Sequence, residues 1–200
     1  MNNYNTSYMT NIDMEDTGYL SLFLGPMYSG KTSKLLELYK QFTFCNIPTI
    51  VINYKGDTRY SDTMLSTHDK QMIPCIMCEY LSEISSNNSQ KFKDAKMILI
   101  NEGQFFNDIV SWVLYAVNSL NKHIYISGLD GDFKRNEFAN NWLSLIPHAD
   151  NVIKLHSYCT ICKKNSAIFS HRIDSNNNQI LISSEAYIPL CRKCYNNLNT

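Results

Sequence analysis

The stretch GPMYSGKT, residues 25–32, has the residue types and spacing that bind nucleotide phosphates. Its glycines let successive main-chain N–H groups turn toward one anion, and a helix beginning there adds its positive end. The lysine reaches the outer phosphates, and the threonine hydroxyl faces Mg²⁺. An apolar run before the loop and an amphipathic one after it make a chance turn the weaker interpretation. The nucleotide contacts predicted from this motif are Gly25, Pro26, Met27, Tyr28, Ser29, Gly30, Lys31 and Thr32.

A second apolar run, Met97–Ile100, ends in Asn101 and Glu102 and resembles a strand whose end faces the phosphates. An aspartate is usual at the first of these positions. The amide of Asn101 can accept a hydrogen bond from metal-bound water but brings no charge, so Mg²⁺ would depend on Thr32, the triphosphate and Asp57. Glu102 is the carboxylate at this strand end and could take a proton from an attacking hydroxyl or water. A solvated glutamate without a catalytic role is the alternative.

Six of the seven cysteines form C-x-x-C pairs. Two of these pairs, Cys159/Cys162 and Cys191/Cys194, could supply four thiolates for tetrahedral Zn²⁺, with free thiols or disulfides as the alternatives. A closed set of four sulfurs leaves no open position, so the sequence predicts a structural metal.

The third pair, Cys75 and Cys78, occupies an apolar run in which positions i and i+3 of a strand face opposite sides. We expect these two cysteines, and the lone Cys45, to be buried as small apolar residues.

Strands and helices are predicted to alternate along the chain. The expected strands are residues 19–24, 49–54, 73–77, 97–100, 123–127 and 152–155, and the expected helices are 33–44, 82–94 with a break, 109–120 and 137–146. Residues 55–71 read as irregular. This order predicts an α/β fold, a P-loop NTPase-like parallel sheet flanked by helices, with a small zinc-ribbon β subdomain after it.

Composition narrows the function further. The formal net charge is zero, which argues against duplex nucleic acid as the main partner. No apolar run approaches a membrane span, and the polar start lacks a signal peptide, so we expect no membrane partner and a cytoplasmic location. The expected organisation is a disordered lead-in at 1–17, a nucleotide-binding domain at 18–156 and a zinc-binding subdomain at 157–200.

Together these residues resemble the type II thymidine kinases. The matching stretches keep the family order and are 25–32, 57–61 (DTRYS), 67–69 (THD), 102–109 (EGQFFNDI), 129–135 (LDGDFKR) and the two cysteine pairs. The resemblance implies ATP, Mg²⁺ and structural Zn²⁺ as cofactors, thymidine as substrate, and phosphorylation of its 5′-hydroxyl. It further implies a homotetramer that is inhibited by thymidine triphosphate.

The resemblance also assigns roles to residues. Glu102 would be the catalytic base. Apart from the resemblance, the charge on a moving phosphoryl group needs a cationic clamp, for which Arg59 is the first candidate and Arg135 the second, with a surface ion pair as the alternative for Arg135. Further nucleotide contacts would be Asp57, Thr58, Arg59, Asn101, Gly103 and Gln104. A lasso loop hanging from the zinc unit would close over the nucleoside. The implied substrate contacts are Met27, Phe105, Leu129, Phe133, Ser170, Gln179, Ile180, Leu181, Ile182, Ser183 and Tyr187.

Three features depart from the family pattern. Asn101 replaces aspartate, Ser183 and Ser184 replace two glycines in the lasso, and the spacing after Cys162 is one residue longer. Two rival functions stay open at this point: a P-loop ATPase, and a zinc-ribbon module that binds nucleic acid.

Overall fold

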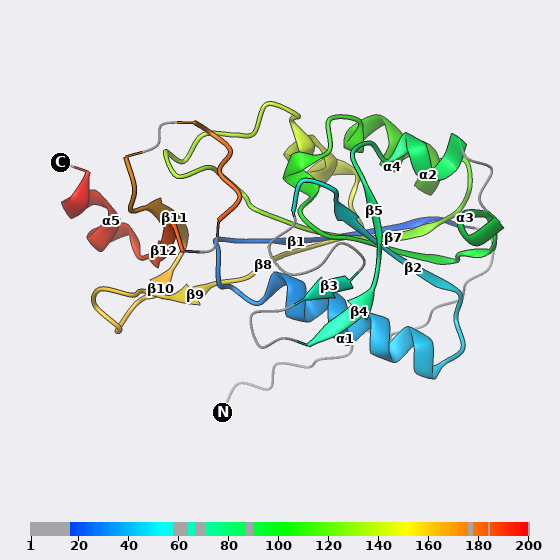
Figure 1. Ribbon diagram of the computed structural model, residues 1–200, viewed down its shortest axis with the longest axis horizontal. Helices are drawn as coiled ribbons and strands as arrows, with labels where there is room; N and C mark the ends of the chain where they lie inside the picture. Colours follow the sequence, from blue (N-terminus) through cyan, green and yellow to red (C-terminus); the bar gives the residue numbers. More distant parts are fainter. Residues whose placement is uncertain are drawn as a thin grey trace.

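A six-stranded parallel sheet forms the centre of the molecule, in the order β5-β2-β6-β7-β1-β8 (Figure 1). The computed structural model describes residues 17–57, 64–66, 71–86, 90–175, 178–183 and 185–199. The central strands are almost uninterrupted apolar runs, because both faces of the sheet are buried. The strand bounds are β1 Tyr19–Leu24, β2 Thr49–Tyr54, β5 Ile76–Cys78, β6 Met97–Ile100, β7 His123–Gly128 and β8 Asn151–Lys154.

Helices cover both faces of this sheet (Figure 1). Helix α1 (Lys31–Phe44) packs Leu35 and Phe42 against one face, and α4 (Ile109–Asn118) packs Trp112 and Val113 against the other. The short helices of this domain are α2 (Ser82–Ser86), α3 (Gln90–Asp94), η1 (Gly103–Phe105) and η2 (Trp142–His148). The predicted α/β fold is confirmed.

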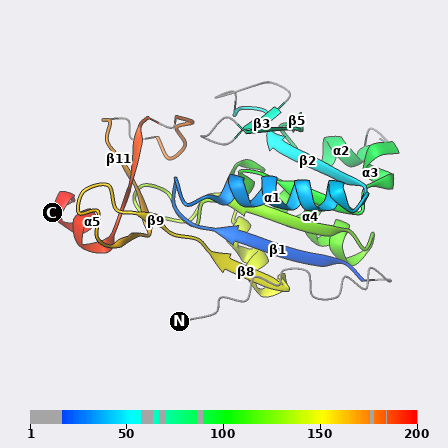
Figure 2. The same cartoon turned by 90° about the horizontal axis from the view of Figure 1, so that it is seen from below.

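The C-terminal part forms a small lobe beyond the end of the sheet where β8 continues into the first lobe strand (Figure 2). It has its own apolar cluster around Ala167, Leu190 and Tyr195. Two antiparallel pairs and one helix build it: β9 (Ser157–Tyr158) with β10 (Ser166–Ala167), β11 (Phe169–Arg172) with β12 (Tyr187–Leu190), and α5 (Arg192–Leu198). The expected small β unit with its cysteine pairs is therefore present.

Two stretches differ from expectation in their strands. Residues 64–66 form a strand, β3 (Met64–Ser66), inside the segment expected to be irregular, and it pairs with β4 (Met72–Pro74). The single strand expected over 73–77 is in fact two, because the chain leaves β4 at Pro74 and joins the central sheet only at β5. Proline has no N–H to continue a ladder of hydrogen bonds.

The helix expected over 137–146 is wrong. The chain forms a 3₁₀ helix, η2 (Trp142–His148), which contains Pro147. Asn141 begins it with φ of 53°, and the Asn140 amide donates to the carbonyl oxygens of Gly103 and Phe106. These bonds tie the preceding residues to η1 and keep them out of a regular helix.

The cysteines outside the lobe divide into two kinds. Cys78 is buried and Cys75 half-buried, and burial raises their thiol pKa values to about 12 and about 11. Cys45 is exposed, so its expected burial is wrong: it follows the last residue of α1, where the chain turns away from the core.

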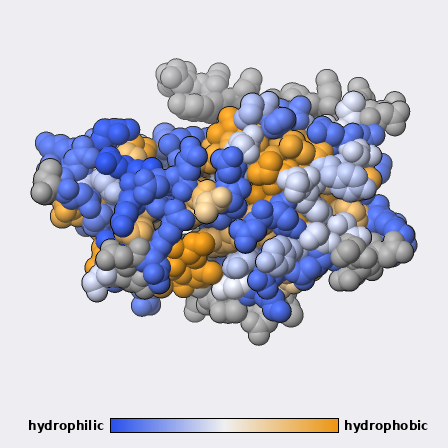
Figure 3. Space-filling view, turned by 90° about the horizontal axis from the view of Figure 1, so that it is seen from above, coloured by the Kyte–Doolittle hydropathy of each residue, from blue (hydrophilic) through white to orange (hydrophobic). Residues whose placement is uncertain are grey.

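Among the described helices, none combines the length and apolar character that crossing a bilayer requires. On the face seen in Figure 3, hydrophilic side chains divide the exposed apolar area into separate patches.

Candidate active site

The loop after β1 adopts a conformation that requires glycine at its start. Gly25 has φ of +145°, and a Cβ there would lie 2.3 Å from the carbonyl oxygen of Leu155. Tyr28 and Gly30 also have positive φ, 61° and 83°, just before α1 begins. Alternation of this kind turns successive N–H groups to one side of the chain, next to the positive end of a helix. The local backbone thus fits the anion cradle predicted from the motif.

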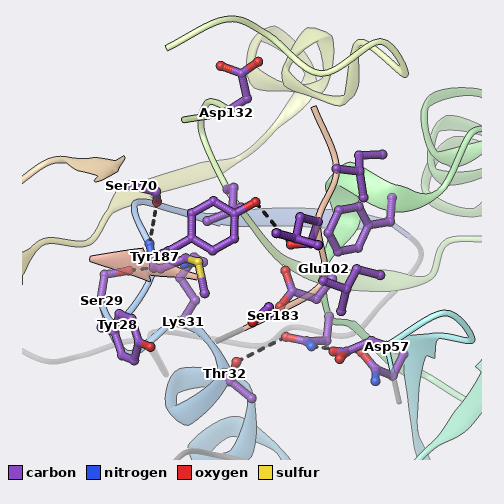
Figure 4. A pocket seen from close by; sticks show the side chains of 18 of the residues that line it. Tyr28, Ser29, Lys31, Thr32, Asp57, Glu102, Asp132, Ser170, Ser183 and Tyr187 are labelled. Carbon is purple, nitrogen blue, oxygen red and sulfur yellow. Dashed lines mark hydrogen bonds between the residues drawn. The ribbon is translucent and has the colours of Figure 1, made fainter. Parts of the chain in front are cut away.

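The lysine and threonine that follow are anchored close to this loop (Figure 4). Lys31 is buried, and its Nζ donates to the carbonyl oxygen of Pro26 at 2.6 Å. Thr32 Oγ1 donates to Asn101 Oδ1 at 3.4 Å, which joins the start of α1 to the end of β6. The start of α1 and the end of β6 therefore lie side by side.

Glu102 follows β6 and takes an unusual backbone conformation. Its φ and ψ are 55° and 47°, a left-handed geometry that turns the chain into η1. Gln104 Nε2 donates to Glu102 Oε2 at 2.6 Å, and Gln104 Oε1 accepts from the Leu129 N–H at 3.0 Å. Gln104 is 2% exposed, so the carboxylate is oriented by a buried residue that is fixed in turn to the end of β7.

One cavity of about 290 Å³ joins these groups to the C-terminal lobe. Its wall includes most of the predicted site: Met27, Tyr28, Ser29, Gly30, Lys31, Thr32, Asp57, Asn101, Glu102, Phe105, Leu129, Phe133, Ser170, Gln179, Ile180, Leu181, Ile182, Ser183 and Tyr187. The functional roles given to these residues remain predictions.

Several of the predicted site residues are not in the cavity wall or lie outside the described residues. Gly25, Pro26, Gly103 and Gln104 are absent from the cavity wall, although the first two build the loop and Gln104 orients Glu102. Thr58 and Arg59, like Ser184 and all but Thr17 of the lead-in, lie outside the described residues.

Arg135 stacks on the lobe instead of lining the cavity. Its guanidinium lies 4.8 Å from the ring centroid of Tyr195 and 5.6 Å from that of Phe169, and Nη1 donates to Asn196 Oδ1 at 3.5 Å. This position favours a structural role over a second phosphate clamp.

The lobe and the phosphate loop are directly connected through Ser170. The Met27 N–H donates to Ser170 Oγ at 2.9 Å, and Ser170 is buried. This bond joins the phosphate loop to β11 of the lobe, and the lobe also contributes residues 179–183, the covering segment, to the cavity wall.

Arg172 holds that covering segment in place. It is 5% exposed, it donates to the main-chain oxygens of Asn178 and Gln179 and to the Tyr187 hydroxyl, and that hydroxyl donates to Leu181 O. The guanidinium also lies 4.0 Å from the centroid of the Phe133 ring. A buried cation thus ties main chain and aromatic side chains together around one end of the cavity.

A second attachment of the segment is through Gln179. Its Nε2 donates at 3.0 Å to Asp132 Oδ2 and at 3.0 Å to the carbonyl oxygen of Glu137. Asp132 Oδ1 in turn accepts the N–H groups of Lys134 and Asn136, so the loop after β7 and the covering segment are fixed to each other.

Sequence reasoning missed a group of wall residues: Ser33, Asn53, Met64, Leu65, Ser66, Gly131, Asp132 and Phe138. Asn53 could have been predicted, because it is a polar residue near the carboxyl end of an apolar strand, where parallel sheets bind their ligands. Met64 to Ser66 were not, because they belong to the segment expected to be irregular.

The four lobe cysteines lie close enough for one ion. Their Sγ atoms all lie within 4.8 Å of one another, and Cys162 and Cys191 are 3.9 Å apart. Tetrahedral Zn²⁺ with Zn–S bonds of about 2.3 Å needs sulfurs about 3.8 Å apart. Burial alone would raise the pKa of Cys159, but hydrogen bonds from the N–H groups of Cys191, Cys162 and Ile161 lower it to about 6. Donor set and spacing fit a zinc-binding four-cysteine cluster, and no disulfide joins these thiols.

Comparison with known proteins gives a consistent result. The family model described as thymidine kinase matches residues 18–195. The chain is 40% identical to the thymidine kinase of Yaba monkey tumor virus over 92% of this chain and 97% of that protein. It is 38% identical to the thymidine kinase of sheeppox virus, over 90% of this chain and 98% of that protein. It is 36% identical to thymidine kinase 1 of Dictyostelium discoideum, over 90% of this chain and 78% of that protein. With this match along nearly its whole length, the chain belongs to the thymidine kinase family.

Proposed function

We propose that the chain transfers the γ-phosphoryl group of ATP to the 5′-hydroxyl of thymidine, releasing ADP and thymidine monophosphate. Thymidine kinase activity follows from membership of the family. The detailed reaction is supported by one observation: residues of the phosphate loop, Glu102 and the covering segment 179–183 line a single cavity. The parts that phosphoryl transfer to a nucleoside would need therefore line one space.

Glu102 is proposed as the general base. Its carboxylate would accept the proton of the 5′-hydroxyl while that oxygen forms its bond to the γ-phosphorus and the bond to the β-phosphate oxygen breaks. The Gln104 hydrogen bond to Oε2 supports this role because it fixes the direction of the carboxylate. Lys31 and the main-chain N–H groups of the loop would offset the charge on the moving group.

The proposed metal contacts lie at the same end of the cavity. Thr32, Asn101 and Asp57 line the cavity and carry side-chain oxygens, the donor type that Mg²⁺ prefers. When bound, Mg²⁺ supplies positive charge that stabilises the transferring phosphoryl group. We propose a structural role for zinc, supported by a lobe whose apolar cluster includes Cys159 and Cys191 themselves.

Thymidine is proposed to lie under residues 179–183, among Met27, Phe105 and Tyr187. Closure by this segment would exclude water, which competes as phosphoryl acceptor. Main-chain groups of the segment would pair with the edge of the base, and a mismatched base would leave them unsatisfied.

Two further parts of the proposal derive from family resemblance, and two derive from the sequence itself. Thymidine triphosphate would inhibit by placing its phosphates on the loop and its base under the segment. A homotetramer is the proposed assembly, to be tested by light scattering. A cytoplasmic location suits a chain with the exposed thiol of Cys45. The division into domains at residues 18–156 and 157–200 is supported by the separate apolar cluster of the lobe.

The test is a panel of nucleosides with ATP and Mg²⁺, in which ADP and nucleoside monophosphate are both measured. We expect equal amounts of ADP and thymidine monophosphate, with little ADP when nucleoside is omitted. Rapid ATP hydrolysis without nucleoside would instead favour the rival ATPase, and steeply salt-dependent DNA binding would favour the nucleic-acid module.

A further inference from the structure

Three neighbouring strands end in polar residues that form a row beside the phosphate loop. Asn53 ends the buried part of β2, Asn101 follows β6, and Ser127 lies near the end of β7. The register pairs Ile52 with Ile100 and Ile100 with Ile126, so the three residues are adjacent across the sheet. Their exposed fractions are 3%, 3% and 1%. Buried polar groups of this kind must satisfy one another.

The hydrogen bonds in this row have a definite direction. Asn101 Nδ2 donates to Asn53 Oδ1 at 2.9 Å. Asn101 Oδ1 accepts from Ser127 Oγ at 2.8 Å and from Thr32 Oγ1 at 3.4 Å. The amide of Asn101 therefore has its NH₂ group turned to Asn53 and its oxygen turned to the threonine at the start of α1.

An amide differs from a carboxylate in a way that matters here. A carboxylate has two equivalent oxygens and presents one of them in either orientation. An amide has one oxygen and one NH₂ group, and the wrong orientation presents a donor where an acceptor is needed. A neutral residue at position 101 must therefore be held in one orientation.

We propose that Asn53 is a positioning residue which directs the Asn101 oxygen toward the site of a divalent cation. The inference rests on the proposed function, since it concerns the cation that accompanies the nucleotide. Asn53 has no need to touch the cation. It acts by accepting the Asn101 NH₂ group, which leaves the Asn101 oxygen facing Thr32.

A purely structural role for the pair is the alternative, and the two roles differ in one respect. If Asn53 only supports the fold, its loss should have the same effect whichever residue occupies position 101. If it orients an amide, its loss should matter much less once Asn101→Asp supplies a side chain that needs no orientation.

The test is a double-mutant cycle with Mn²⁺ as the spectroscopic probe of the cation. Electron paramagnetic resonance measures the Mn²⁺ dissociation constant in the presence of a non-hydrolysable ATP analogue, so the readout does not require turnover. Asn53→Val and Asn53→Ala, which lack the acceptor and differ in size, are made with and without Asn101→Asp. Melting temperatures without metal report on folding. Asn151→Val is the matched control. Asn151 donates to Oγ of Ser21 in β1 at 3.3 Å, and neither residue lines the cavity.

We expect both Asn53 variants to weaken Mn²⁺ binding at least about tenfold, the effect typical of losing a residue that orients a metal ligand. In the Asn101→Asp background the same changes should weaken it less than about threefold, and Asn151→Val should have no effect. Equal weakening in both backgrounds, or none in either, would overturn the inference and leave the kinase proposal standing. A wild-type complex that binds the analogue but no Mn²⁺ would overturn the proposed cation site and the inference with it.

Discussion

Replacing Arg172 by methionine should release the segment that covers the nucleoside end of the cavity. Methionine keeps the length and apolar contacts of the side chain but removes three hydrogen bonds from a charged donor and the stacking on Phe133. Such bonds are worth about 1.5–3 kcal/mol each, and a desolvated cation over a ring about 2 kcal/mol. All of these contacts belong to one guanidinium and their energies are not additive, so we take the net loss as that of about one charged hydrogen bond.

A net loss of about 2 kcal/mol from the closed segment lowers the ratio of closed to open segment by a factor of about 30. The KM for thymidine should rise by about that factor, because only the closed form grips the nucleoside. The KM for ATP should stay within about threefold, since the partners of Arg172 named above belong to the covering segment, β12 and the loop after β7, and not to the phosphate loop.

Steady-state kinetics with each substrate varied in turn measures both constants. Arg135→Met is the matched control, because Arg135 also stacks on aromatic rings but lies outside the cavity wall. A thymidine KM within threefold of wild type in a folded Arg172→Met protein, or an equal rise in both KM values, would refute the reasoning.

Three further predictions concern the metal, the thiols and the loop. Purified protein should contain one zinc ion per chain by mass spectrometry of the metals, and Cys162→Ser should lose it and lower the melting temperature; a stable, zinc-free wild type would contradict this. At pH 8 Cys45 should react with a disulfide reagent at least about a hundredfold faster than Cys78. Burial raises the pKa of the Cys78 thiol to about 12, so this thiol is almost entirely protonated at pH 8. Similar rates for the two cysteines would be inconsistent with the structure. Gly25→Ala should abolish binding of an ATP analogue in calorimetry, because its Cβ would meet a carbonyl oxygen at 2.3 Å, whereas Gly131→Ala meets nothing nearer than 3.6 Å and should bind normally.

The parts of the fold that the sequence predicts are those with local signals. Uninterrupted apolar runs identify the central strands, and the loop motif identifies the start of α1, because each depends on neighbouring residues alone. The cysteine pairs are also recognisable, since four thiolates at this spacing have few other uses in one chain.

The parts that could not be predicted depend on contacts between distant segments. The row of Asn53, Asn101 and Ser127 exists only because β2, β6 and β7 are neighbours in the sheet, and nothing local specifies that order. Arg172 reads as an ordinary charged residue in a short strand, and its role appears only when the covering segment folds over it. The 3₁₀ helix at Trp142–His148 replaces the expected helix because the Asn140 side chain bonds to a turn far back in the chain.

The most direct test of the central claim is single-turnover phosphoryl transfer by Glu102→Gln. Glutamine can still accept the Gln104 hydrogen bond that orients position 102, but it cannot take a proton. We expect transfer to slow by at least about a hundredfold, while the dissociation constants for thymidine and an ATP analogue stay within about threefold of wild type. Transfer at a rate close to that of the wild type would contradict the account, because the proton would then have another acceptor.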